Sequence, residues 1–166
     1  MKTHKLVVRW ATPEDKHSIA EFLRSLMVYT GSLYGKAESE IKTLDAVLGS
    51  LDRTLHPLCN VKFVIAEVDG QSVGICGVEM SYSTWHAKPY IVINDVYVDE
   101  SCRRMRVGTR ILKFVTDHAH ATGCCRIDLF VESANISAQW MYEQSGFTKL
   151  NQLSYSIPIN PDQGVP

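Results

Sequence analysis

A dense group of positive charges surrounds one glycine in the second half of the 166-residue chain. Five of the 17 Lys and Arg residues fall within eleven positions: Arg103, Arg104, Arg106, Arg110 and Lys113. The group lies between an apolar run of strand type, residues 90–98, and an amphipathic helix predicted over about residues 106–121. The first turn of a helix has unpaired backbone amides and a positive dipole end, and Gly108 lets the backbone approach a ligand closely. The pattern therefore predicts an anion site, with a solvated basic loop as the alternative.

Two common phosphate motifs are absent. The loop of nucleotide hydrolases requires G-x-x-x-x-G-K-[ST], and no Lys-Ser or Lys-Thr pair follows a glycine at that spacing. A dinucleotide-binding fold requires G-x-G-x-x-G, which does not occur either. The predicted anion site therefore belongs to neither of these classes.

A second candidate group lies further along the chain, on a short helix predicted over residues 135–144. Asn135 and Tyr142 are seven positions apart, which is two helical turns, so their side chains share one face. Taken alone, Tyr142 would more often be a core or rim aromatic than a functional group.

These two segments together resemble the GNAT acetyltransferase superfamily. The family carries [QR]-x-x-G-x-[GA], and Arg103-Arg104-Met105-Arg106-Val107-Gly108 matches its first and last positions. The family's later motif, N-x-x-[AS]-x-x-x-[YF]-x-x-x-G-[FA], is similar to the run from Asn135 to Phe147. Arg106 stands where the family has glycine. We expect this to be tolerated because φ is negative at a helix start.

The resemblance implies an acetyl-CoA site and assigns its parts. The pyrophosphate is expected at the loop residues Arg103, Arg104, Met105, Arg106, Val107, Gly108 and Thr109, and the pantetheine arm at Val96, Tyr97, Val98, Asn135 and Ala138. Tyr142 is expected near the thiol, where its hydroxyl would protonate the departing thiolate as a general acid. The expected reaction is direct transfer of the acetyl group to a primary amine of a small molecule or peptide in a ternary complex.

The acceptor side is less well specified. The chain looks most like the diamine and polyamine acetyltransferase branch, but Ser83 and Asn94 replace its Asp and Glu. Asp95 or Glu79, acting through water, is a candidate for the general base, and Asn94 would orient the water or the amine. The amine pocket is expected at Tyr29, Tyr34 and Glu38, with Trp85 and His86 opposite. A non-catalytic acyl-CoA-binding module and a transferase for a longer acyl-CoA are the alternatives.

The elements that position these residues follow from the apolar pattern. Strands are expected at residues 6–10, 61–68, 72–82, 90–98 and 126–131, with one or two more over 147–157, and helices at about 13–30, 38–51, 106–121 and 135–144. Runs of strands with crossover helices predict an α/β protein (a mixed α+β sheet), and the resemblance implies the GNAT fold with about six or seven strands flanked by about four helices. Residues 1–157 are predicted to form a single domain and residues 158–166 a flexible C-terminal tail.

Composition limits the other possibilities. The chain is 45% hydrophobic with a net charge of −1, which predicts a folded protein without a general affinity for nucleic acid. Its five cysteines have no Cys-x-x-Cys spacing and its N-terminus lacks a secretory signal, so a soluble, cytoplasmic protein without metal or membrane partner is expected. His118 and His120 diverge on their predicted helix and form no metal site. The resemblance also implies a homodimer.

Overall fold

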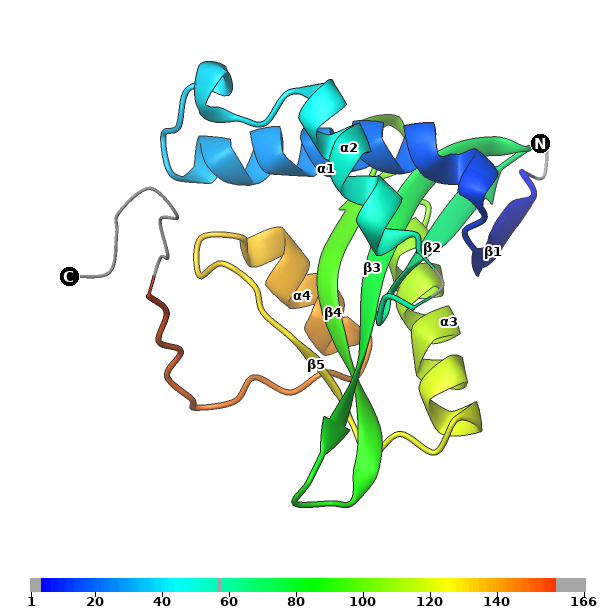
Figure 1. Cartoon of the computed structure of the whole chain (residues 1–166), viewed down its shortest axis with the longest axis vertical. Helices are drawn as coiled ribbons and strands as arrows, with labels where there is room; N and C mark the ends of the chain where they lie inside the picture. Colours follow the sequence, from blue (N-terminus) through cyan, green and yellow to red (C-terminus); the bar gives the residue numbers. More distant parts are fainter. Residues whose placement is uncertain (1–3, 57, 158–166) are drawn as a thin grey trace.

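The computed structural model describes residues 4–56 and 58–157, and its centre is one mixed β-sheet (Figure 1). The five strands lie in the order β1-β2-β3-β4-β5, where every neighbouring pair is antiparallel except β4 and β5, which are parallel. Their bounds are β1 Leu6–Trp10, β2 Val61–Val68, β3 Gln71–Ser83, β4 Lys88–Val98 and β5 Ile127–Leu129. Within this sheet of described strands, the parallel pair β4 and β5 is connected by the crossover helix α3.

Helices cover both faces of the sheet (Figure 1). Their bounds are α1 Lys16–Leu33, α2 Leu44–Thr54, α3 Val107–Ala121 and α4 Ile136–Gln144. One buried cluster joins α1 and α2 to the side chains of Phe63, Ile65 and Ile75 on one face of the sheet. A larger cluster on the other face packs α3, through residues such as Ile111, and Tyr142 of α4 against the strands. The sheet thus has a hydrophobic core on each side, which fixes both helix layers relative to β4.

The turn between β2 and β3 shows how local sequence sets strand register. Asp69 and Gly70 have φ values of 50° and 82°. Two successive residues with positive φ are typical of the tight hairpin turn whose twist matches that of the strands, and Asp-Gly is a preferred sequence for it. The Asp-Gly sequence therefore suits the turn that closes this hairpin.

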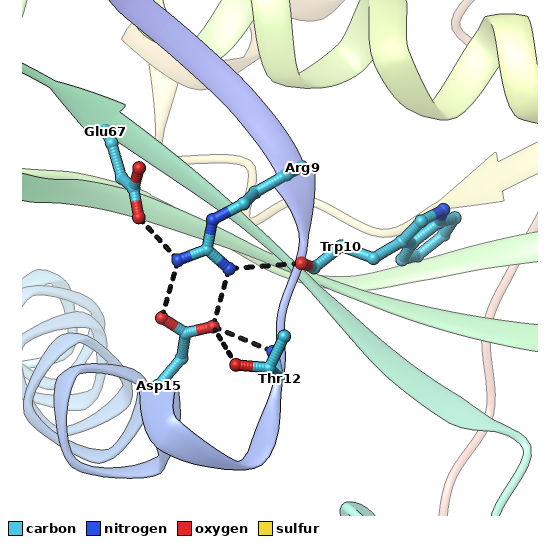
Figure 2. A network of polar contacts seen from close by, with 5 residues as sticks. All are labelled: Arg9, Trp10, Thr12, Asp15 and Glu67. Atoms are coloured by element: carbon cyan, nitrogen blue, oxygen red, sulfur yellow. Dashed lines mark hydrogen bonds and ion pairs between the residues drawn. The ribbon is translucent and has the colours of Figure 1, made fainter. Parts of the chain in front are cut away.

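An ion network fastens the start of the chain to the sheet (Figure 2). The Arg9 guanidinium on β1 donates to both carboxylate oxygens of Asp15, at 2.7 and 2.9 Å, and also contacts Glu67 on β2. The same Asp15 carboxylate accepts a hydrogen bond from the Thr12 backbone amide at 2.7 Å, which caps the start of the short 3-10 turn Pro13–Asp15 before α1. The hydrogen bonds from Arg9 hold the pKa of Asp15 below its ordinary value. Their stabilisation is therefore present at neutral pH and is lost as pH falls through that lowered pKa.

The expected fold class is confirmed, with two corrections. The strand count is wrong: residues 147–157 form no strand among the described residues, so five strands replace the expected six or seven. The segment pairs with none of the five described strands, and its apolar side chains, such as Leu153 and Tyr155, are exposed. The second helix begins at Leu44 rather than near residue 38, because the Thr43 hydroxyl caps it by accepting the Ala46 amide at 3.3 Å. The predicted tail, residues 158–166, lies outside the described residues.

Within the described ranges, no helix has the length and apolar character needed to cross a membrane.

Candidate active site

The sheet opens where β4 and β5 separate. The two strands pair only at three positions, from Ile91 with Ile127 to Ile93 with Leu129. The next residue of β4, Asn94, is extra in the ladder with β3, because Gly77 faces Asp95 while Val78 faces Ile93. Such a bulge bends a strand and increases its twist. The end of β4 beyond the bulge is therefore free on the side away from β3, as far as the described strands extend.

A pocket of about 500 Å³ fills the space beside this free edge. It lies among the ends of β4 and α1, the start of α3 and the start of α4. Eleven of the residues expected to bind the cofactor line it: Val96, Tyr97, Val98, Arg103, Arg104, Arg106, Val107, Gly108, Thr109, Asn135 and Ala138. The structure thus brings together two motifs that lie about thirty residues apart in the sequence.

One end of the pocket is the first turn of α3. Val107, Gly108 and Thr109 are the first three helical residues, and the first intrahelical hydrogen bond runs from the Arg110 amide to the Arg106 carbonyl at 3.0 Å. Their three amides therefore have no partner within the helix and lie beside the pocket, together with the positive end of the helix dipole. This is the arrangement that binds phosphate groups.

The conformation expected for Arg106 is wrong. Arg106 is the N-cap of α3 and has φ 59° and ψ 22°, which is left-handed rather than the negative φ expected at a helix start. Arg104 is also left-handed, with φ 70°. A non-glycine residue in this region carries about 1–3 kcal/mol of backbone strain. The strained turn exposes the α3 amides, and glycine would adopt it without cost.

Gly108 has a packing role in addition to its place in the pocket. A Cβ placed on Gly108 would lie 2.5 Å from the Met141 sulfur of α4, well inside van der Waals contact. Val98 of β4 is the next neighbour, at 3.8 Å. The absence of a side chain therefore lets α4 approach the start of α3, and this close approach forms the floor of the pocket.

The other wall of the pocket is α4. The Asn135 side chain caps this helix, with its Oδ1 accepting the Ala138 amide at 3.2 Å. Tyr142, two turns later, is only 9% exposed and packs edge-on against Phe147. It does not line the pocket, and burial raises the pKa of its hydroxyl to about 12. Its side chain is therefore part of the core next to the pocket, and its hydroxyl is protonated at neutral pH.

Three polar residues gather at the bulge. The Asn94 amide donates to a Glu79 carboxylate oxygen at 3.1 Å, so these two residues of neighbouring strands form one unit at the surface. Asp95 is mostly buried against Gly77, where a Cβ would lie 2.9 Å from its Oδ2. Burial raises the pKa of Asp95 above its ordinary value. The structure therefore places a carboxyl group with a raised pKa next to Val96 of the pocket.

Comparison with known proteins agrees with this geometry. A family model described as the acetyltransferase (GNAT) family matches residues 29–147, which is more than half of the chain. The chain belongs to the GNAT acetyltransferase family. The described sheet, bulge and helix order are accordingly those of a GNAT domain.

Individual GNAT relatives are distant. An uncharacterized N-acetyltransferase, YhfO of Bacillus subtilis (strain 168), is 30% identical over 84 residues, which cover 51% of this chain and 56% of that protein. The chain thus matches about half the length of this relative. A thialysine N-epsilon-acetyltransferase of Bos taurus is 27% identical over 154 residues, covering 89% of this chain and 86% of that one. The solved structure of the aminoglycoside N-acetyltransferase AAC(6')-Iy in complex with CoA has a TM-score of 0.74 at 16% identity, covering 95% of this chain and 97% of that chain, which shows the shared fold.

The residues expected at the acceptor side of this GNAT domain do not converge. Tyr29 lines the pocket, whereas Tyr34 caps the end of α1 and is 56% exposed. Glu38 lies in a second, polar hollow of about 410 Å³ that shares Tyr29 and Tyr97 with the pocket. Trp85 and His86 lie in the turn between β3 and β4, at the opposite end of β4 from the pocket (Figure 1). The tip of this long hairpin lies away from the pocket of the same chain. These two residues therefore do not line the pocket.

Several residues of the pocket were not found from the sequence. Leu26 and Cys102 line it from outside both family motifs, and Tyr29 was assigned to the amine instead. Ser137, Trp140 and Met141 line it from positions of the second motif at which any residue is allowed. Conversely, Met105 belongs to the first motif but does not line the pocket and is 40% exposed. It stands between two left-handed residues, which turn the backbone around it. The amphipathic pattern of α1 does carry a signal for Leu26, but that signal is indistinguishable from core packing.

Among residues 4–56 and 58–157, no cluster of three or more His, Cys, Asp and Glu side chains is arranged to hold a metal ion.

Proposed function

We propose that this GNAT chain is an acetyl-CoA-dependent N-acetyltransferase that acetylates a primary amine of a small molecule or peptide. The observation that carries the proposal is the single pocket in which the unpaired α3 amides, three arginines and the free edge of β4 meet. These features match a long ligand whose negatively charged end binds the α3 amides and the arginines and whose amide-containing arm lies along the free edge of β4. Acetyl-CoA is such a ligand, and it supplies the activated acetyl group.

The residues of the chain fit the two ends of this cofactor. At the charged end, the amides of Val107, Gly108 and Thr109 would hold the pyrophosphate, and Arg103, Arg104 and Arg106 would add formal charge. Along the arm, Val96, Tyr97 and Val98 offer an unpaired strand edge, and Asn135 and Ala138 form the opposite wall. Backbone amides at this edge would stabilise the negative charge that develops on the carbonyl oxygen.

Transfer to an amine requires two proton movements. The amine nitrogen forms a bond to the acetyl carbon while the carbon–sulfur bond breaks, so nitrogen loses a proton and sulfur gains one. Tyr142 fits the second step because its raised pKa keeps the hydroxyl protonated, and it shares a helix face with Asn135 and Ala138. Asp95 fits the removal of the proton from nitrogen, through a water molecule, because its raised pKa makes its carboxylate a stronger base. Glu79, held by Asn94, is the other candidate base.

The amine would approach from the α1 side of β4. Asp95 shares that face with Tyr97, which belongs to the α1–α2 core, while Val96 and Val98 face the other core. Tyr97 lines both the pocket and the hollow that contains Glu38, so it would border the acceptor. Relatives named for thialysine and aminoglycoside acetylation support an amine acceptor.

Two measurements test the proposal in sequence. Calorimetric titration with CoA should show binding to one site per chain; absence of binding at millimolar CoA removes the proposed cofactor. A thiol-release assay with acetyl-CoA and a panel of amines, amino acids and peptides should then show turnover. CoA binding without thiol release for any acceptor would instead favour the non-catalytic module, and turnover only with longer acyl-CoA would redefine the acyl donor.

We further propose that two copies of the chain associate through its C-terminal third. Among the described residues, eight of the 13 exposed large apolar side chains fall within residues 130–157: Phe130, Val131, Ile136, Trp140, Leu150, Leu153, Tyr155 and Ile157. Such a concentration of exposed apolar surface marks an interaction site. Light scattering after gel filtration should show a dimer for the wild type and a monomer for Leu153→Asp with Tyr155→Asp, while Leu58→Asp, another exposed site, leaves the mass unchanged. A monomeric wild type would refute the association.

All five cysteines are unpaired, which supports the cytoplasmic location that the sequence predicts.

A further inference from the structure

Tyr29 of α1 makes contacts with both halves of the pocket. Its hydroxyl donates to Asn135 Oδ1 on α4 at 3.4 Å. Its ring lies under the Arg103 guanidinium, 5.4 Å from centroid to Cζ, at the start of the β4–α3 loop. Tyr29 is therefore the side chain that joins α1 to both motifs assigned to the cofactor.

The contact with Asn135 settles which way its amide group points. The Ala138 backbone amide is a donor, so the Asn135 atom that it contacts must be the oxygen. The Ser137 hydroxyl donates to the same oxygen at 3.3 Å, and the Tyr29 hydroxyl is a third donor. Three donors occupy Oδ1, so Asn135 presents its Nδ2 hydrogens, and not its oxygen, to a ligand in the pocket.

The contact with Arg103 restricts the position of its positively charged guanidinium. The Arg103 guanidinium donates through Nε to the Val98 carbonyl at 3.4 Å and pairs with Glu100 at 3.0 Å. The Tyr29 ring covers one face of this guanidinium, where a cation is attracted to the π-system. Together the three contacts limit the positions that this flexible side chain can take beside the α3 amides.

We propose that Tyr29 is a positioning residue for the cofactor, which aligns Asn135 through its hydroxyl and Arg103 through its ring. This inference rests on the proposed acetyl-CoA site and deepens it. It assigns Asn135 as a hydrogen-bond donor to a carbonyl oxygen of the pantetheine arm. It also moves Tyr29 from the acceptor side, where the sequence placed it, to the cofactor side.

Two substitutions separate the two contacts. Tyr29→Phe removes the hydroxyl and keeps the ring, so it should weaken CoA binding about threefold while leaving the affinity for 3′-phospho-ADP, which lacks the pantetheine arm, unchanged. Tyr29→Leu removes both contacts and should weaken CoA about tenfold and 3′-phospho-ADP about threefold. Asn135→Asp keeps the capping oxygen but loses the Nδ2 donors, so it should weaken CoA and pantetheine and spare 3′-phospho-ADP.

Calorimetric titration of each variant with CoA, pantetheine and 3′-phospho-ADP decides the matter, with thermal unfolding as the check on folding. A wild type that binds none of these probes would refute the acetyl-CoA site itself. A wild type that binds CoA, together with a Tyr29→Phe variant of equal CoA affinity, would refute only the positioning role. If Tyr29→Phe weakened the binding of CoA, pantetheine and 3′-phospho-ADP equally, the positioning role would also be refuted. Such a result would indicate a general structural effect and not one confined to the pantetheine arm.

Discussion

The two sides of β4 differ in the groups that would bind the proposed cofactor and the proposed amine. On the α3 and α4 side, the pocket is built mainly from backbone: three helix-start amides, the free strand edge and a glycine that admits α4. On the α1 side, the chemistry depends on single side chains at the bulge, Glu79, Asn94 and Asp95. Backbone recognition is fixed by secondary structure and so resists substitution, whereas side-chain recognition changes with one residue. We infer that the proposed cofactor side tolerates substitution better than the proposed acceptor side.

The largest expected effect that separates binding from chemistry comes from Tyr142→Phe. The substitution keeps the ring that packs on Phe147 but removes the proton that the departing thiolate requires. Turnover should fall about 100-fold or more, while CoA affinity stays within about twofold. Steady-state kinetics and calorimetry measure the two quantities. Equal losses in both would show that Tyr142 is part of the core only.

The next effect belongs to the acceptor side. Asp95→Asn should lower turnover about 100-fold at neutral pH and leave CoA affinity unchanged, because it removes a base without touching the pocket lining. Burial raises the pKa of Asp95, so the wild-type rate should fall as pH drops through that raised pKa and the carboxylate becomes protonated. The variant should lack this acidic limb. Glu79→Gln is the matched control, and a larger loss there would move the base to Glu79.

A smaller effect is expected at the strained turn on the cofactor side. Arg106→Gly relieves a left-handed conformation and should raise the free energy of unfolding by about 1 kcal/mol. It also removes one positive charge beside the pocket, so CoA affinity should fall about threefold. Denaturant unfolding and CoA titration measure these opposite changes. Lys113→Ala removes a charge that does not line the pocket and should change neither quantity appreciably; unchanged stability in Arg106→Gly would argue against strain.

The smallest effect concerns Trp85, which is 91% exposed at the tip of the β3–β4 hairpin. Because the hairpin tip is remote from the pocket of its own chain, Trp85→Ala should leave both the KM for the amine and the affinity for CoA unchanged. Steady-state kinetics over a range of amine concentrations provide the test. A raised KM would mean that the hairpin reaches an acceptor site after all, through the partner chain of the proposed dimer.

The features that the sequence predicted well depend on backbone geometry, and those that it missed depend on tertiary packing. Motif spacing located the α3 turn and the α4 wall because both depend on backbone geometry that a few residue types report. It failed for Arg106, whose side chain gives no sign of a left-handed φ. It also failed for Trp85, because strand lengths and register decide how far a hairpin tip lies from a site. It did not predict the contacts of Tyr29 with Asn135 and Arg103, since only the packing of α1 brings these residues together. Residues 147–157 have a strand-like sequence, but a strand forms only beside a partner strand, and the apolar pattern does not identify that partner.

The contact between Gly108 and Met141 has an evolutionary consequence. The two positions share one small volume, so neither can grow unless the other shrinks. In descendants of this chain, an alanine or serine at position 108 should appear together with a smaller or reoriented residue at position 141. Because the two helices form opposite parts of one pocket, such paired substitutions would change the pocket's width. Position 141 is thus a point at which selection could adjust the proposed cofactor binding.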